Sequence, residues 1–107
     1  MTKCEFFTQD DRITGFSVCG HSGYAEAGSD IVCAAISAAV ELTITIVHDV
    51  CGGTAKLRVK EEDARITLTL PAQCEEDEAI QAVLAGMMLY LLSLRDDYSD
   101  YIEVLEV

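Results

Sequence analysis

GHSGYAEAGSDIVCAAIS, residues 20–37, contains the change from loop to helix around which the rest of the fold is predicted. Residues 20–28 hold three glycines and no large aliphatic side chain, which predicts a mobile loop. Ser29 and Asp30 are both good N-caps, and the aspartate also places negative charge at the positive end of a helix. We therefore predict a helix from Ser29 or Asp30 to about His48, although β-branched residues at 43–47 disfavour its last turns.

The segments on both sides of this helix predict a ββαββαβ order. A second helix is expected from about Glu75 to Arg95, because four acids crowd its first turn and an apolar run follows. The strands are predicted from alternating polarity at Lys3–Thr8, Ile13–Cys19, Thr54–Lys60, Ala64–Leu70 and Tyr101–Val107. The expected fold is α/β (α+β): one domain, residues 1–107, forming a two-layer sandwich of a mostly antiparallel sheet with two helices on one face.

The net charge and the cysteine content of the chain indicate which partners it can bind and in which cellular compartment it is expected. A net charge of −12, from 19 acids against 7 bases, repels nucleic acid and attracts a basic partner, although solubility alone would also explain it. Five cysteines without paired spacing, and no secretory segment, favour free thiols in the cytoplasm. Ala79–Leu94, taken as the most apolar stretch, is shorter than the ~18–20 residues that cross a bilayer, so no membrane contact is expected.

Both predicted helices are apolar over most of their circumference. Apolar residues cover more than one face of the second helix: Leu84, Met87, Met88, Leu91 and Leu92. Either a homodimer forms through the helical layer, or the two helices bury each other within one subunit.

Cys33 falls in the first turn of the first predicted helix, three residues after Asp30. Backbone N–H groups there have no intrahelical partner, and the helix dipole adds about half a positive charge. Both effects favour the nucleophilic thiolate, and the same N–H groups could hold an oxyanion. The alternative is an ordinary buried cysteine, because position alone does not separate the two roles.

The chain has two histidines, and only one can reach Cys33. His48 lies 15 residues further along the same helix, about 22 Å away at 1.5 Å per residue. We interpret it as a helix-end residue that interacts with the last carbonyls. His21 lies on the flexible loop, only 12 residues before Cys33, and is therefore the candidate base.

Other residues between positions 20 and 37 could also take part in the site, and the sequence leaves their roles open. Asp30 could orient His21 or be only the N-cap, and its charge would oppose a thiolate at Cys33. Ser37 could hydrogen-bond within the site, although a bond back to a helix carbonyl is the commoner role. Opening of the loop for an extended peptide would be allowed by Gly20, Gly23 and Gly28.

Metal binding is the competing chemistry. Cys19 and His21 form a Cys-x-His pair to which other thiolates could add, namely Cys33, Cys51 and Cys74. Structural zinc sites usually use Cys pairs separated by two to four residues, and the sequence has none, nor a redox Cys-x-x-Cys pair. We expect neither a metal nor an organic cofactor.

Taken as one unit, residues 20–37 resemble the signature of the ribosomal-processing cysteine protease family, Prp. That signature runs Gly-His, a small residue and Gly, then a short loop, then Gly-x-Asp-Ile-Val-Cys-Ala-Ala and a Ser. The matching residues are Gly20, His21, Gly23, Tyr24, Ala25, Gly28, Asp30, Ile31, Val32, Cys33, Ala34, Ala35 and Ser37. Chain length and element order are also similar.

The resemblance implies a homodimeric cysteine endopeptidase with a dyad of His21 and Cys33. Such enzymes remove an N-terminal extension from a protein of the large ribosomal subunit, and a basic substrate of that kind would be attracted by the acidic chain. The alternative is a non-catalytic acidic module that binds a ribosomal protein or assembly factor. In that case His21 and Cys33 would serve only the fold.

Overall fold

A five-stranded sheet and two long helices make up the computed structural model, which describes residues 1–26 and 28–107. The strands are β1 (Thr2–Gln9), β2 (Arg12–Cys19), β3 (Lys56–Lys60), β4 (Arg65–Thr69) and β5 (Ile102–Glu106). The helices are α1 (Ile31–Thr45) and α2 (Asp77–Asp97), with short helical turns η1 (Ile46–Val50) and η2 (Glu61–Asp63). The order ββαββαβ is as predicted.

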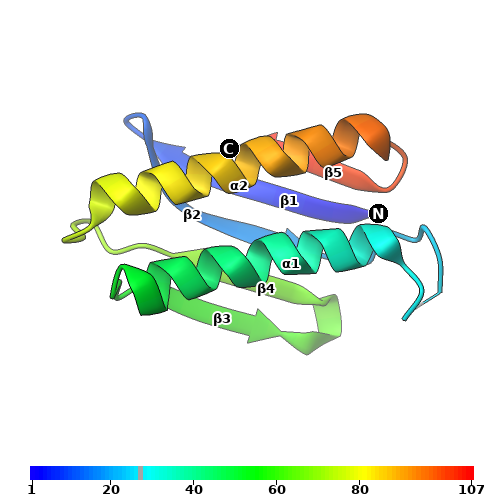
Figure 1. The fold of residues 1–107 in the computed structure, drawn as a ribbon, viewed down its shortest axis with the longest axis horizontal. Helices are drawn as coiled ribbons and strands as arrows, with labels where there is room; N and C mark the ends of the chain where they lie inside the picture. Colours follow the sequence, from blue (N-terminus) through cyan, green and yellow to red (C-terminus); the bar gives the residue numbers. More distant parts are fainter. Residues whose placement is uncertain (27) are drawn as a thin grey trace.

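Both helices lie side by side on one face of the sheet (Figure 1). The strand order is β3-β4-β2-β1-β5, so β3 and β5 are the edge strands. Three strand pairs are antiparallel, while β5 runs parallel to β1 because α2 carries the chain across the sheet between β4 and β5. The predicted two-layer, mostly antiparallel architecture is therefore confirmed.

The core lies between the sheet and the helices. Phe6, Phe16 and Leu68 are fully buried on the helix-facing side of the sheet. Opposite them lie the buried hydrophobic residues Val32, Ile36, Val40, Val47, Ile80, Leu84, Met87 and Leu91. Their spacing of three or four residues puts them on one stripe of each helix, and each large side chain contributes roughly 1.5–3 kcal/mol by burial. This packing fixes α1, and therefore its N-terminus, against the sheet.

The end of α1 differs from the prediction. The α-helix stops at Thr45, and η1 continues it as a π-helical turn in which the Cys51 N–H bonds to the Ile46 carbonyl at 2.8 Å. β-branched side chains crowd the preceding turn, and a wider turn relieves that crowding. His48 lies in η1, but its Nε2 bonds to the carbonyl of Ala55 at 3.1 Å, beyond the helix. The predicted contact with the last helix carbonyls was wrong.

The first turn of α2 is tied to β2 by an ion pair. The Arg12 guanidinium bonds to Asp77 at 2.7 Å and to the carbonyl of Pro71 at 2.9 Å. The hydrogen bond from Arg12 lowers the pKa of the Asp77 carboxyl, against a smaller opposing effect of desolvation. α2 thus begins at Asp77, two residues later than predicted, so only two of the four acids lie in its first turn.

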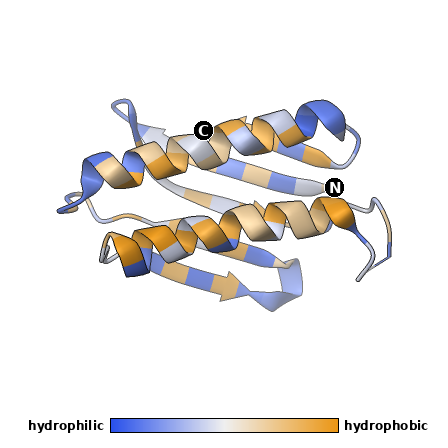
Figure 2. Cartoon of the chain, viewed as in Figure 1, coloured by the Kyte–Doolittle hydropathy of each residue, from blue (hydrophilic) through white to orange (hydrophobic). Residues whose placement is uncertain are grey.

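Two helical segments, Ile31–Val50 and Asp77–Asp97, are long and apolar enough to cross a membrane by length and composition. The prediction took Ala79–Leu94 as the most apolar stretch and overlooked α1, which η1 lengthens with further apolar residues. A mostly buried core helix meets the same criterion, but only 28% and 22% of the apolar windows of these two segments are buried, as one stripe of each helix against the sheet. Figure 2 shows that apolar residues also follow the outward side of α1.

Candidate active site

Asp30 is the N-cap of α1, and its carboxylate joins the helix to the loop before it. Oδ1 accepts the Cys33 N–H at 2.9 Å. Oδ2 accepts the Ser22 hydroxyl and the N–H groups of Tyr24 at 3.2 Å and Ala25 at 3.3 Å. Burial opposes ionisation, but the hydrogen bonds, led by that from Ser22, hold the pKa of the Asp30 carboxyl well below its ordinary value.

Of the two interpretations of Asp30, the geometry shows the N-cap. Its carboxylate makes no hydrogen bond to His21 among the residues that the structure describes. The charged oxygens are instead occupied by donors from the loop and the helix. Asp30 therefore organises the backbone around Cys33 rather than the imidazole.

Ser22 places two polar groups beside the sulfur of Cys33. Its backbone N–H donates to Sγ at 3.3 Å, and its hydroxyl oxygen lies 3.5 Å from the same sulfur, close enough to accept the thiol proton. The side chain is only 2% exposed. Sequence reasoning missed this residue, because a small residue between His21 and Gly23 gives no sign of burial. The only available signal was its place beside the candidate base.

His21 and Cys33 line the same two cavities, together with Ser37. One, of about 250 Å³, lies between α1 and the sheet, and its apolar walls include Val18, Ile36, Val40 and Ile66. The other, of about 410 Å³, is bounded by the loop and the start of α1. His21 is exposed, and no hydrogen bond joins its ring to Cys33 in the described part of the chain. The two side chains thus line common space with no hydrogen bond between them among the described residues.

Ser37 is exposed on α1, one turn after Cys33. No hydrogen bond of its side chain is found within residues 1–26 and 28–107, so the expected bond back to a helix carbonyl was wrong. Thr43 makes such a bond instead, to Ala39 at 2.8 Å. The Ser37 hydroxyl is therefore free to meet a ligand in either cavity.

Gly20 starts the loop at a point where only glycine fits without strain. Its φ is +85°, and a Cβ there would lie 2.8 Å from the carbonyl oxygen of Met1. Its N–H donates to the carbonyl of Asp63 at 3.2 Å, which ties the loop to η2. Gly23 and Gly28 also have positive φ, but a Cβ at either would meet no heavy atom within 4 Å.

Tyr24 anchors the middle of the loop to the opposite end of the chain. Its ring meets those of Tyr98 and Tyr101 edge to face, with centroids 5.5 and 5.2 Å apart. These contacts hold the loop beside the end of α2 while Asp30 holds it to α1. Sequence reasoning did not predict this cluster, because α1, the β3–β4 hairpin and α2 separate Tyr24 from Tyr98 and Tyr101 in the chain.

The donors available to an oxyanion differ from the prediction. The Cys33 N–H is occupied by Asp30 Oδ1, and the Ala34 N–H by the Asp30 carbonyl at 3.0 Å. The prediction that the N–H groups of the first turn are free was therefore wrong for Cys33. The Ser22 N–H is the backbone donor that points at the sulfur.

The cysteines are free thiols, and no group of three or more His, Cys, Asp or Glu in the described residues could hold a metal ion. Burial, together with the nearby Cys19, raises the pKa of the Cys4 thiol to about 12. Cys33 is half-buried and opens onto the two cavities.

A sequence model described as "Cysteine protease Prp" matches residues 1–103. The chain belongs to this family. The Prp family consists of cysteine proteases, and one relative is the ribosomal processing cysteine protease Prp of Bacillus subtilis (strain 168). It is 27% identical over 99 residues, which cover 91% of this chain and 88% of the relative.

Solved structures agree with the fold. Prp from S. aureus, in complex with a covalently linked product peptide, has a TM-score of 0.90 at 18% identity, with both chains covered completely. A protein from Streptococcus mutans has a TM-score of 0.87 at 22% identity, covering 100% of this chain and 94% of that one. The architecture is therefore that of Prp.

Proposed function

We propose that the chain is an endopeptidase in which Cys33 is the nucleophile and His21 the base, and which removes the N-terminal extension of a large-subunit ribosomal protein. The observation that carries the proposal is that these two side chains line the same two cavities at the start of α1. The relative from Bacillus subtilis is named a ribosomal processing protease. A further S. aureus Prp structure holds a substrate peptide.

The chemistry follows from the groups around the sulfur. His21 takes the proton of Cys33, whose Sγ forms a bond to the scissile carbonyl carbon, and the carbonyl π electrons move to its oxygen. The Ser22 N–H, already aimed at the sulfur, is placed to donate to that oxyanion. Collapse expels the amine, which receives the proton from His21. Water then hydrolyses the thioester and restores the thiol.

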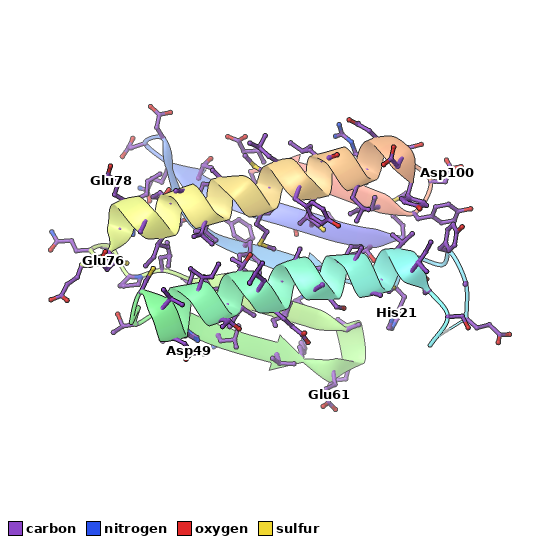
Figure 3. All side chains as sticks on the ribbon, viewed as in Figure 1. His21, Asp49, Glu61, Glu76, Glu78 and Asp100 are labelled. Carbon is purple, nitrogen blue, oxygen red and sulfur yellow. The ribbon has the colours of Figure 1, made fainter. Side chains whose placement is uncertain are left out.

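The substrate cleft has acidic surroundings that suit a basic protein. Glu41 lines the smaller cavity, and η2, which is wholly acidic, is joined to the loop through the Gly20 N–H. Figure 3 shows His21 and Glu61 at the same end of the molecule. A basic chain would be steered to this end by the charge, while the apolar walls of the cavity would hold its uncharged side chains.

The test is cleavage of the extended ribosomal protein, followed by mass spectrometry. We expect Cys33→Ala and His21→Ala to abolish cleavage, while Cys51→Ala, which removes a thiol far from His21 in sequence, leaves it intact. Retained cleavage in Cys33→Ala would show that the proposed nucleophile is wrong.

A non-catalytic acidic module that binds a ribosomal protein or assembly factor is the second candidate, favoured by the net charge of −12. Alkylation separates the two. At neutral pH an active Cys33 should react with iodoacetamide ahead of the other thiols, and His21→Ala should slow that reaction. Equal reactivity of Cys33 and the other half-buried thiols would favour the binding module.

We also propose a homodimer through the helical layer. The outward groove between α1 and α2 encloses about 420 Å³ and is lined almost entirely by apolar residues. Leu42 is 62% exposed and Tyr90 48% exposed at this groove. A second copy would remove this apolar surface from water. Light scattering at low micromolar concentration should give twice the chain mass, and Leu42→Asp should shift it to the monomer.

The free thiols support a cytoplasmic location, which we propose for this chain. A reducing compartment keeps the Cys33 sulfur available for nucleophilic attack. Fractionation of the host cell should place the protein with the soluble ribosomal precursors, and recovery with membranes would contradict this.

A further inference from the structure

The β3–β4 hairpin carries an unusual share of the positive charge of this acidic chain. Of 7 bases against 19 acids in the whole sequence, four lie on these two strands: Lys56, Arg58, Lys60 and Arg65. The other three, Lys3, Arg12 and Arg95, are on separate elements. The two strands therefore form a local basic surface on an acidic molecule, while the turn η2 that joins them is acidic.

These bases face one side of the sheet. Lys56, Arg58 and Lys60 alternate along β3, and the register places them beside Thr69, Thr67 and Arg65 of β4. The same six residues line a hollow of about 410 Å³. Because the intervening residues pair with Leu68 and Ile66 on the helix-facing side, the hollow lies on the side of the sheet away from α1 and α2.

Acidic partners within the chain reach only one end of the hollow. Asp63 pairs with Lys60 and with Arg65, both at 3.8 Å. Arg65 also donates to the Ser17 hydroxyl at 2.8 Å. No salt bridge involves Lys56 or Arg58 among the residues that the structure describes. The end of β3 that lies away from η2 thus presents charge that nothing in the described fold neutralises.

β3 is also an edge strand, and all five of its residues are exposed. On its helix-facing side, Leu57 is 42% and Val59 63% exposed. An extended chain added to this edge would place every second side chain, about 6.8 Å apart, beside a base, and the others beside Leu57 and Val59. The edge therefore matches a segment in which acidic and apolar residues alternate.

We propose that the free edge of β3 binds an extended segment of a partner protein in which acidic residues alternate with apolar ones. A second copy of β3 does not fit, because antiparallel pairing would set bases opposite bases. A nucleic acid fits less well, because its long phosphate chain would meet the acidic remainder of the surface. The hollow shares no lining residue with the two cavities at Cys33, so the proposal does not depend on the proposed function.

The test uses the full chain and a fluorescein-labelled peptide, Glu-Val-Glu-Val-Glu-Val-Glu, followed by fluorescence anisotropy. The comparison ligands are a peptide of the same composition with its glutamates clustered, and an oligouridine of ten nucleotides. We expect the alternating peptide to bind at least about fivefold more tightly than either. Tighter binding of the clustered peptide or of the oligouridine, or no saturable binding below roughly 1 mM, would overturn the proposal.

Two double variants with the same change in net charge locate the site. Lys56→Glu/Arg58→Glu should weaken binding of the alternating peptide by at least about tenfold. Lys3→Glu/Arg95→Glu should leave it within about twofold, because those bases lie away from β3. Equal weakening in both would mean that only net charge matters, which would overturn the proposal. Circular dichroism confirms that each variant is folded.

Discussion

Replacing Gly20 with alanine tests how the start of the loop after β2 packs against Met1, the residue directly before β1. The φ of +85° places the residue in the left-handed region, where a side chain costs roughly 1–2 kcal/mol. The new Cβ would also lie 2.8 Å from the Met1 carbonyl oxygen, which is backbone and cannot rotate away. Overpacking of this kind adds about 1–3 kcal/mol. Gly20→Ala should therefore lower the free energy of unfolding by about 2–5 kcal/mol.

Gly23→Ala is the matched control. Its φ of +76° gives a similar backbone strain, but a Cβ there has no heavy atom within 4 Å. Its loss should be only about 1–2 kcal/mol, and any gain from a stiffer unfolded chain is the same in both variants. The difference between them, about 1–3 kcal/mol, isolates the contact with Met1.

Urea unfolding followed by circular dichroism measures both values, because the chain has no tryptophan for a fluorescence assay. Gly20→Ala should also slow peptide cleavage more than Gly23→Ala, since the shift occurs directly before His21. If the two variants lost equal stability, or if Gly20→Ala were neutral, the packing of the loop start against Met1 would be refuted.

Ser22→Ala should reduce kcat/KM for peptide cleavage roughly tenfold, because it removes a hydrogen bond to a charged acceptor; Ser22→Thr should restore part of the loss, and an unchanged rate would contradict a positioning role. Asp30 has a lowered pKa, so its stabilising contribution is present above the ordinary carboxyl range and is lost as pH falls. Asp30→Asn should accordingly give a flatter dependence of Tm on pH in acid, and an unchanged slope would contradict this. The pKa of Cys4 is raised to about 12, so its contribution is present below its unfolded value and is lost as pH rises toward 12. Cys4→Ala should flatten the alkaline decline in Tm, and a decline as steep as in the parent chain would count against the burial of this thiol.

The elements were predictable because each depends on local signals. Alternating polarity located the two hairpins, and Asp30 marked the start of α1 through its N-cap chemistry. The π-helical turn was not predictable, because β-branched residues only weaken an α-helix and tertiary packing decides what replaces it.

The site was predictable only as far as its chemistry shows in residue types. His21 and Cys33 are reactive residue types at informative positions, and they line the same two cavities, while their pairing as base and nucleophile stays a prediction. Ser22 acts through its burial beside Asp30 and Cys33, whereas Tyr24 packs on the rings of two residues far along the chain. Neither burial nor a long-range ring contact is marked by the residue type, and for that reason the roles of both residues were missed.

The two carboxylate oxygens of Asp30 accept hydrogen bonds from different segments of the chain. In the described part of the chain, Oδ1 accepts from the helix, through the Cys33 N–H, while Oδ2 accepts from the loop, through Ser22, Tyr24 and Ala25. The loop can therefore detach from one oxygen while the other keeps the first turn of α1 wound. Cys33, the proposed nucleophile, would then keep its position at the start of α1 if the segment that carries His21, the proposed base, moved.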